Sequence, residues 1–145
     1  MIDTLNPFRL PVHPPLVHFP IALLVLAWIF LLIRYSTGDV RWDERSRLIE
    51  RIGVATLPVV VIAAVIDTRG FSFLSPPRWD APLVWHALGG ICVSIVFAGH
   101  LLWRTRFPVG RLTGRLAALD LSVASFGVWL LLAVGLIAGE MVYAS

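Results

Sequence analysis

Lysine is absent from this 145-residue sequence, and charged residues of every kind are scarce. They make up 14% of the chain, whereas about a quarter of a soluble globular domain is charged. Hydrophobic residues reach 58%, and the mean hydropathy is +0.84. This composition argues against a soluble domain and predicts a membrane protein.

Cysteine is nearly absent too, because Cys92 is the only one in the sequence. A single cysteine excludes an intramolecular disulfide, and the lack of a Cys-x-x-Cys-His motif excludes covalently attached c-type haem. Cys92 lies within an apolar run, so we expect a small buried packing residue. All twelve basic residues are arginines that flank apolar runs instead of forming a patch with interleaved aromatics, so nucleic-acid binding is not expected.

Four apolar segments, separated by short linkers, follow one another along a single domain, residues 1–145. They predict an all-α, integral membrane four-helix bundle with spans at about 16–33, 52–66, 82–103 and 121–142. The first segment is too long for the apolar region of a signal peptide, so we interpret it as a retained span. The second is shorter than the roughly 20 residues that usually cross a bilayer.

The arginines predict the orientation of the spans, because basic loops remain on the cytoplasmic side. The first and third linkers, together with the residues that directly adjoin them, hold nine of the twelve arginines. We therefore expect both linkers in the cytoplasm and both termini on the outer side. These nine residues are Arg34, Arg41, Arg45, Arg47, Arg51, Arg104, Arg106, Arg111 and Arg115.

In this topology each span brings an ionisable residue toward the outer face. Ionisable groups at membrane depth are costly and usually functional. His18 belongs to the first span, Asp67 ends the second, His86 opens the third and Glu140 lies near the end of the fourth. His13 is expected among the lipid headgroups, and Asp67 and Glu140 fit interfacial helix ends equally well.

His18 and His86 should lie at similar depth, because their spans run in the same direction. Two neutral imidazoles facing each other across a bundle can fill both axial positions of a haem iron. Gly89 and Gly90 follow His86 by one helical turn and would leave room for a porphyrin edge; close helix packing is the alternative reason for them.

His100 lies fourteen residues after His86, a spacing similar to that of di-haem b-type cytochromes. A second haem would need another ligand at the inner ends of the spans, and the sequence has no histidine there. We therefore expect one haem b at most and interpret His100 as an interfacial histidine.

Two other kinds of function stay open. His18, Asp67, His86 and Glu140 together would suit non-haem iron, manganese, zinc or copper. Alternatively, the chain is a cofactor-free accessory subunit that packs against a larger membrane complex through glycine faces such as Gly135 and Gly139.

The stretch HPPLVHFP at residues 13–20 resembles the opening of a family of small bacterial membrane proteins of unknown function, with the signature His-Pro-x-x-Val-His-Phe-Pro. The resemblance extends over the whole chain and includes Asp67, His86 and the ending Gly139-Glu140-Met141-Val142-Tyr143. Ala138 stands where many members have another glycine. The resemblance implies a multi-pass protein of the bacterial inner membrane, and some relatives look fused or adjacent to redox modules.

The leading hypothesis is a b-type haem subunit that passes electrons between quinol and an outer-side redox partner. His18 and His86 would be the ligands. Asp67 or Glu140 would take up the quinol protons, because carboxylates in apolar surroundings have raised pKa values.

Overall fold

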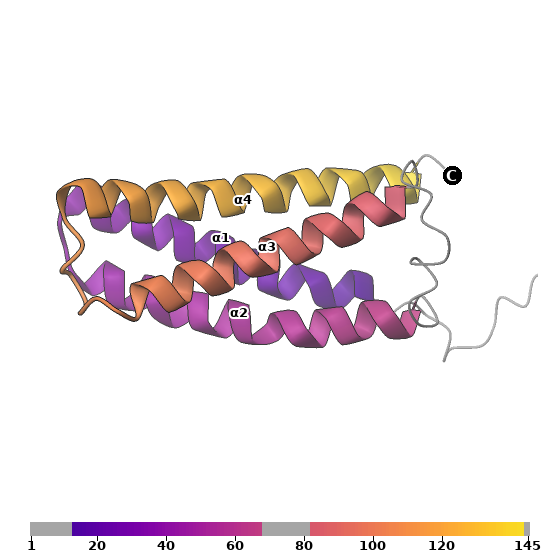
Figure 1. Ribbon diagram of the computed structural model, residues 1–145, viewed down its shortest axis with the longest axis horizontal. Helices are drawn as coiled ribbons and strands as arrows, with labels where there is room; N and C mark the ends of the chain where they lie inside the picture. Colours follow the sequence, from indigo (N-terminus) through magenta and orange to yellow (C-terminus); the bar gives the residue numbers. More distant parts are fainter. Residues whose placement is uncertain (1–12, 68–81, 144–145) are drawn as a thin grey trace, which may run out of the picture.

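The computed structural model describes the backbone of residues 13–67 and 82–143, with the side chains of residues 15–66 and 84–139. The described chain forms four helices, each long and apolar enough to cross a membrane, which confirms the predicted all-α membrane bundle. Figure 1 shows them side by side, with both short links at one end. They are α1 (His13–Thr37), α2 (Arg41–Asp67), α3 (Pro82–Arg104) and α4 (Gly114–Tyr143).

Each helix packs mainly against its two neighbours around the bundle. Helix α1 packs against α2 and α4, and α3 packs against the same two helices, so α1 and α3 are diagonally opposed. The α1–α2 and α3–α4 links lie together at the left in Figure 1, which we call the loop end of the bundle. The arginine-rich linkers therefore share one end of the molecule, as the hydropathy pattern predicted.

The α1–α2 link is a tight corner made by one glycine and one aspartate. Gly38 has a φ of 75°, a conformation that suits glycine, and its N–H donates to the carbonyl of Arg34 at 2.9 Å. Asp39 Oδ1 accepts the backbone N–H of Arg41 at 3.0 Å, which caps the start of α2. Hydrogen bonds from the Arg41 side chain hold the pKa of Asp39 below its usual value.

Helix α2 is longer than its apolar segment, because it begins eleven residues earlier, with a polar stretch from Arg41 to Arg51. At 1.5 Å per residue the polar stretch covers about 16 Å and the apolar residues 52–66 about 22 Å. The apolar part alone accounts for most of a hydrocarbon layer. The polar part therefore lies at the loop-end boundary of the membrane, and this is where the polar side chains gather.

The centre of the bundle is apolar and is built by all four helices. A buried cluster consists of Leu24, Val93, Phe97, Val128 and Leu131, with Val54 and Leu57 of α2 packed against it. Large apolar side chains also cover the outside of the helices, as expected for a surface that faces lipid. Cys92 belongs to this exposed surface, so the prediction of a buried cysteine was wrong.

Glycines allow neighbouring helices to approach closely at three places. A Cβ on Gly53 would lie 2.9 Å from Leu24, and one on Gly127 would lie 2.8 Å from Phe97. At Gly89 an added Cβ would overlap a methyl group of Val134 on α4. By contrast, a Cβ on Gly135 or Gly139 would meet no atom within 4 Å among the described residues.

We predict that Gly89→Ala destabilises the bundle and that Gly90→Ala does not. The first change forces Val134 away and separates α3 from α4, which should cost about 1–3 kcal/mol. The second adds a methyl group where nothing lies within 4 Å and improves helix propensity. Thermal unfolding of both variants in the same detergent measures the difference; equal melting temperatures would contradict the predicted contact.

Candidate functional site

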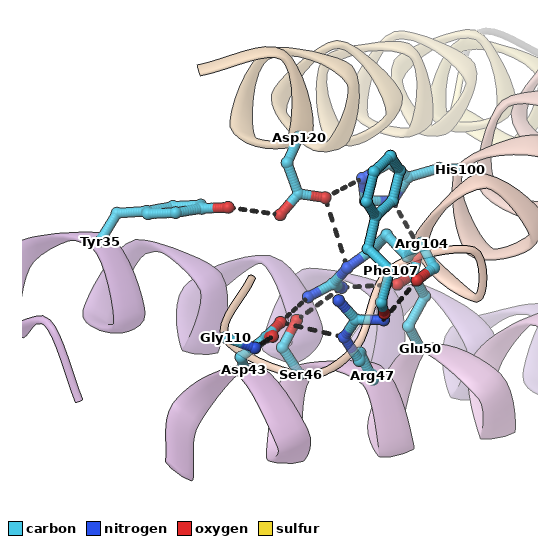
Figure 2. Close-up of polar contacts among 10 residues, drawn as sticks. All are labelled: Tyr35, Asp43, Ser46, Arg47, Glu50, His100, Arg104, Phe107, Gly110 and Asp120. Atoms are coloured by element: carbon cyan, nitrogen blue, oxygen red, sulfur yellow. Dashed lines mark hydrogen bonds and ion pairs between the residues drawn. The ribbon is translucent and has the colours of Figure 1, made fainter. Parts of the chain in front are cut away.

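A group of polar side chains, all but one of them buried, joins all four helices at the loop end of the bundle, and Figure 2 shows their contacts. We call this group the ionic cluster. One side chain comes from α1, four from α2, two from α3 and one from α4. Its members are Tyr35, Asp43, Ser46, Arg47, Glu50, His100, Arg104 and Asp120.

The α2 members form one stripe of the helix. Asp43, Ser46, Arg47 and Glu50 follow the spacing i, i+3, i+4 and i+7, which places them on a single face. All four are buried, while Glu44, Arg45 and Arg51 between or beside them are exposed. The polar start of α2 therefore turns a charged face inward, against α3 and the α3–α4 link.

Arg104, the last residue of α3, is the centre of the cluster and is only 1% exposed. Its Nη2 lies 2.6 Å from Asp43 Oδ1, and its Nη1 lies 2.8 Å from Glu50 Oε2. Nη1 also donates to Ser46 Oγ at 3.0 Å, and Nε is 3.3 Å from Asp120 Oδ1. The guanidinium thus faces carboxylates of both α2 and α4. This pairing offsets the large cost of removing a charge from water.

His100, one helical turn before Arg104, bridges two carboxylates. Its Nδ1 lies 2.6 Å from Glu50 Oε1, and its Nε2 lies 2.9 Å from Asp120 Oδ1. A neutral imidazole has one N–H donor, and an ionised carboxylate only accepts. Both contacts can be hydrogen bonds only if the imidazole is protonated or one carboxyl carries the proton. The geometry therefore requires one ionisable proton in this part of the cluster.

That proton makes the cluster electrically neutral. Arg47, Arg104 and a protonated His100 supply three positive charges, and Asp43, Glu50 and Asp120 supply three negative charges. Loss of the proton would leave one uncompensated negative charge among buried groups, which is costly in a medium of low polarity. Protonation and packing at the loop end are thus coupled.

The end of α3 and the α3–α4 link bond directly to the α2 members of the cluster. Arg47 Nη1 donates to the carbonyls of Arg104 and Phe107, and Arg47 Nε donates to Asp43 Oδ1 at 3.2 Å. The N–H of Gly110 donates to Asp43 Oδ2 at 2.7 Å. Gly110 has a φ of 76°, so a glycine suits this turn.

The cluster is more exposed at α1 than elsewhere. The hydroxyl of Tyr35 donates to Asp120 Oδ2 at 2.7 Å, and Tyr35 is half-buried, whereas the cluster residues of α2, α3 and α4 are all buried. Nearer the middle of the bundle, Trp28 Nε1 donates to Ser125 Oγ at 2.9 Å. Among the described side chains, hydrogen bonds from Trp28 and Tyr35 connect α1 to α4, and the one from Tyr35 reaches the cluster.

His100 was interpreted from the sequence as an interfacial histidine, and its depth in the membrane stays a prediction. The sequence analysis did not foresee that it is 3% exposed and hydrogen-bonded on both ring nitrogens. Trp103 stacks beside it, with ring centroids 6.1 Å apart. The acidic partners were missed because Glu50 belongs to a charged stretch that reads as a cytoplasmic loop. The spacing of the buried stripe on α2 was the signal that could have found them.

The two predicted haem ligands belong to the other end of the bundle. His18 is exposed and His86 is half-buried, with its Nδ1 3.4 Å from the carbonyl oxygen of Val134. Gly89 packs against Val134, as the close-packing alternative predicted, while a Cβ on Gly90 would meet open space.

The side chains of His13, Asp67 and Glu140 lie outside the described residues, so the four-residue site predicted at this end stays a prediction. Within the described side chains, no group of three or more His, Cys, Asp and Glu residues could hold a metal ion.

A comparison with protein-family models matches residues 9–145 to the family described as "Predicted membrane protein (DUF2231)". The chain belongs to this family. The match covers nearly the whole sequence, and it agrees with the four helices that can cross a membrane. The protein is therefore a multi-pass membrane protein. No curated protein and no solved structure matches the chain.

We predict that Arg104→Met strongly destabilises the fold, because it leaves buried carboxylates on α2 and α4 without their cation. Breaking a buried ion pair in this way costs about 3–5 kcal/mol. Arg106→Met is the matched control, since Arg106 is exposed two residues later and should change stability by less than about 0.5 kcal/mol. Thermal unfolding in detergent measures both; similar melting temperatures would contradict the central role of Arg104.

Proposed function

We propose that this protein is a membrane subunit that binds and releases a proton at the ionic cluster. The supporting observation is the position of His100 between Glu50 and Asp120, which requires one proton shared among three ionisable side chains. Ionisable groups buried in membrane proteins commonly form proton relays and ion pathways. On the arginine distribution, the cluster faces the cytoplasm of a bacterial cell and the termini face outward.

The arrangement suits coupling of proton release to a structural change better than simple storage of a proton. Release of the proton leaves a negative charge inside the cluster, so release needs a compensating event. A shift of the α3–α4 link, or a change imposed by a neighbouring membrane protein, would supply such an event at the groups that Arg47 and Arg104 hold. This proposal agrees with the hypothesis of an accessory subunit in a larger membrane complex, and it assigns proton binding and release to that subunit.

The proton can be followed by nitrogen NMR of protein labelled in its histidine rings. We expect the two His100 nitrogens to have imidazolium shifts at low pH and to convert to a neutral form as the pH rises. Thermal stability should fall over the same pH interval, because deprotonation leaves a buried negative charge. His100→Gln assigns the signal, and His18→Gln is the control that keeps it.

A His100 signal that stays unchanged from about pH 5 to about pH 10 would contradict the proposal. The ionic cluster would then be a permanently charged clamp that only stabilises the helix ends.

A second candidate function is the b-type haem subunit predicted from the sequence, with His18 and His86 as ligands. The contact of His86 Nδ1 with the carbonyl of Val134 favours it, because metal-ligating histidines usually donate their other ring nitrogen to such a partner. The diagonal position of α1 and α3 also suits two ligands on opposite sides of one group. The contact between Gly89 and Val134 restricts the space beside His86. Haem would supply one-electron transfer, with quinol and an outer-side redox protein as partners.

The haem candidate is tested by the absorbance of protein purified from cells supplied with haem. Haem predicts a Soret band that disappears in both His18→Ala and His86→Ala and persists in His100→Gln. Absence of a Soret band in the unmodified protein would contradict it. Stoichiometric iron, zinc, manganese or copper without porphyrin would favour the non-haem metal site instead, and loss of that metal in His18→Ala would then be required.

A further inference from the structure

Tyr35 differs from the other members of the ionic cluster in its exposure. It lies in the last turns of α1 at the loop end and is half-buried, while Asp43, Ser46, Arg47, Glu50, His100, Arg104 and Asp120 are all buried. Its hydroxyl is 2.7 Å from Asp120 Oδ2, on the carboxylate whose other oxygen contacts His100. Tyr35 therefore connects the membrane boundary to the group that shares the proton.

We propose that the proton enters and leaves the ionic cluster through the hydroxyl of Tyr35. This inference rests on the proton-binding function proposed above. It assigns to Tyr35 the transfer between water at the loop end and the pair formed by Asp120 and His100. A phenol suits this position, because its oxygen can donate one hydrogen bond while it accepts another.

The transfer needs only exchange of protons between oxygen and nitrogen atoms. During uptake the Tyr35 O–H bond breaks and its proton passes to Asp120 Oδ2, while the phenol oxygen takes a replacement proton from a water molecule, which is left as hydroxide in the solvent. The Asp120 carboxyl then turns and gives a proton to His100 Nε2, which restores the carboxylate and completes the imidazolium. One proton enters, and Tyr35 and Asp120 return to their starting forms.

The surrounding charges and contacts favour this side over the α3–α4 link. The Arg34 guanidinium carbon lies 5.8 Å from the centroid of the Tyr35 ring, so the phenol lies beside a charged group at the loop end. Arg104 and His100 are the charged partners of Asp120, and Arg104 also pairs with Asp43 on α2. At the α3–α4 link, backbone groups of Arg104, Phe107 and Gly110 bond directly to Arg47 and Asp43 and close that approach.

The test measures how fast the His100 ring N–H protons exchange with water in the full chain at one pH. Tyr35→Phe keeps the aromatic ring and removes only the hydroxyl, so exchange should slow by about a hundredfold. Ser125→Ala is the matched control: it removes a different α1–α4 hydrogen bond, the one from Trp28, and should leave the exchange rate unchanged. Thermal unfolding checks that both variants keep the fold.

The direction of the change in exchange rate distinguishes a proton pathway through Tyr35 from a role in which Tyr35 only shields the ionic cluster from water. If Tyr35 only shields the cluster, Tyr35→Phe lets water in and exchange becomes faster. A faster or unchanged rate would overturn the inference. Failure of the proposed function is seen separately, in the unmodified protein, as a His100 signal that does not titrate.

Discussion

The arrangement of this bundle depends on one buried cation, Arg104. A guanidinium without contact to water must be surrounded by carboxylates, since an unpaired buried charge costs several kcal/mol. This requirement brings Asp43 and Glu50 of α2 and Asp120 of α4 to the end of α3. The same carboxylates then determine the place of His100 and, through Asp120, of Tyr35 on α1. The pairing of one side chain therefore fixes the relative position of four helices.

Such a constraint matters more in a membrane than in water. Lipid chains are as apolar as leucine side chains, so apolar contacts alone hardly specify which helix faces pair. Along most of their length these helices present large apolar side chains outward and a small apolar core inward. Close approach at Gly89 and Gly127 sets the distance between α3 and α4, whereas the polar contacts at the loop end set their alignment along the bundle axis.

The sequence was sufficient to predict the helices, because the signals for them are local. It was insufficient to predict the ionic cluster, because the cluster depends on contacts between helices. Long apolar runs predict membrane spans directly, and arginine-rich linkers predict which helix ends lie on the same side of the membrane. The charged start of α2, Arg41–Arg51, was interpreted as a loop because it is too polar for a hydrocarbon layer. Asp43, Arg47 and Glu50 nevertheless follow helical spacing. Asp120 gave no local signal, because its partners lie on other helices. The predicted site with His18 and His86 lies at the opposite end, and its carboxylates are outside the described side chains.

The separation between the two ends limits how they can influence each other. His86 and His100 share α3 and are fourteen residues apart, which corresponds to about 21 Å along the axis. A unit charge added near His86 would change the energy of the ionic cluster by only about 0.8 kcal/mol at an effective dielectric constant of about 20. That is little more than half a pKa unit. Electrostatics over this distance therefore cannot drive a proton on or off His100. Any coupling between the ends must act through movement of α3, whose last residue is Arg104, and would change the contacts of Arg104 with α2 and α4.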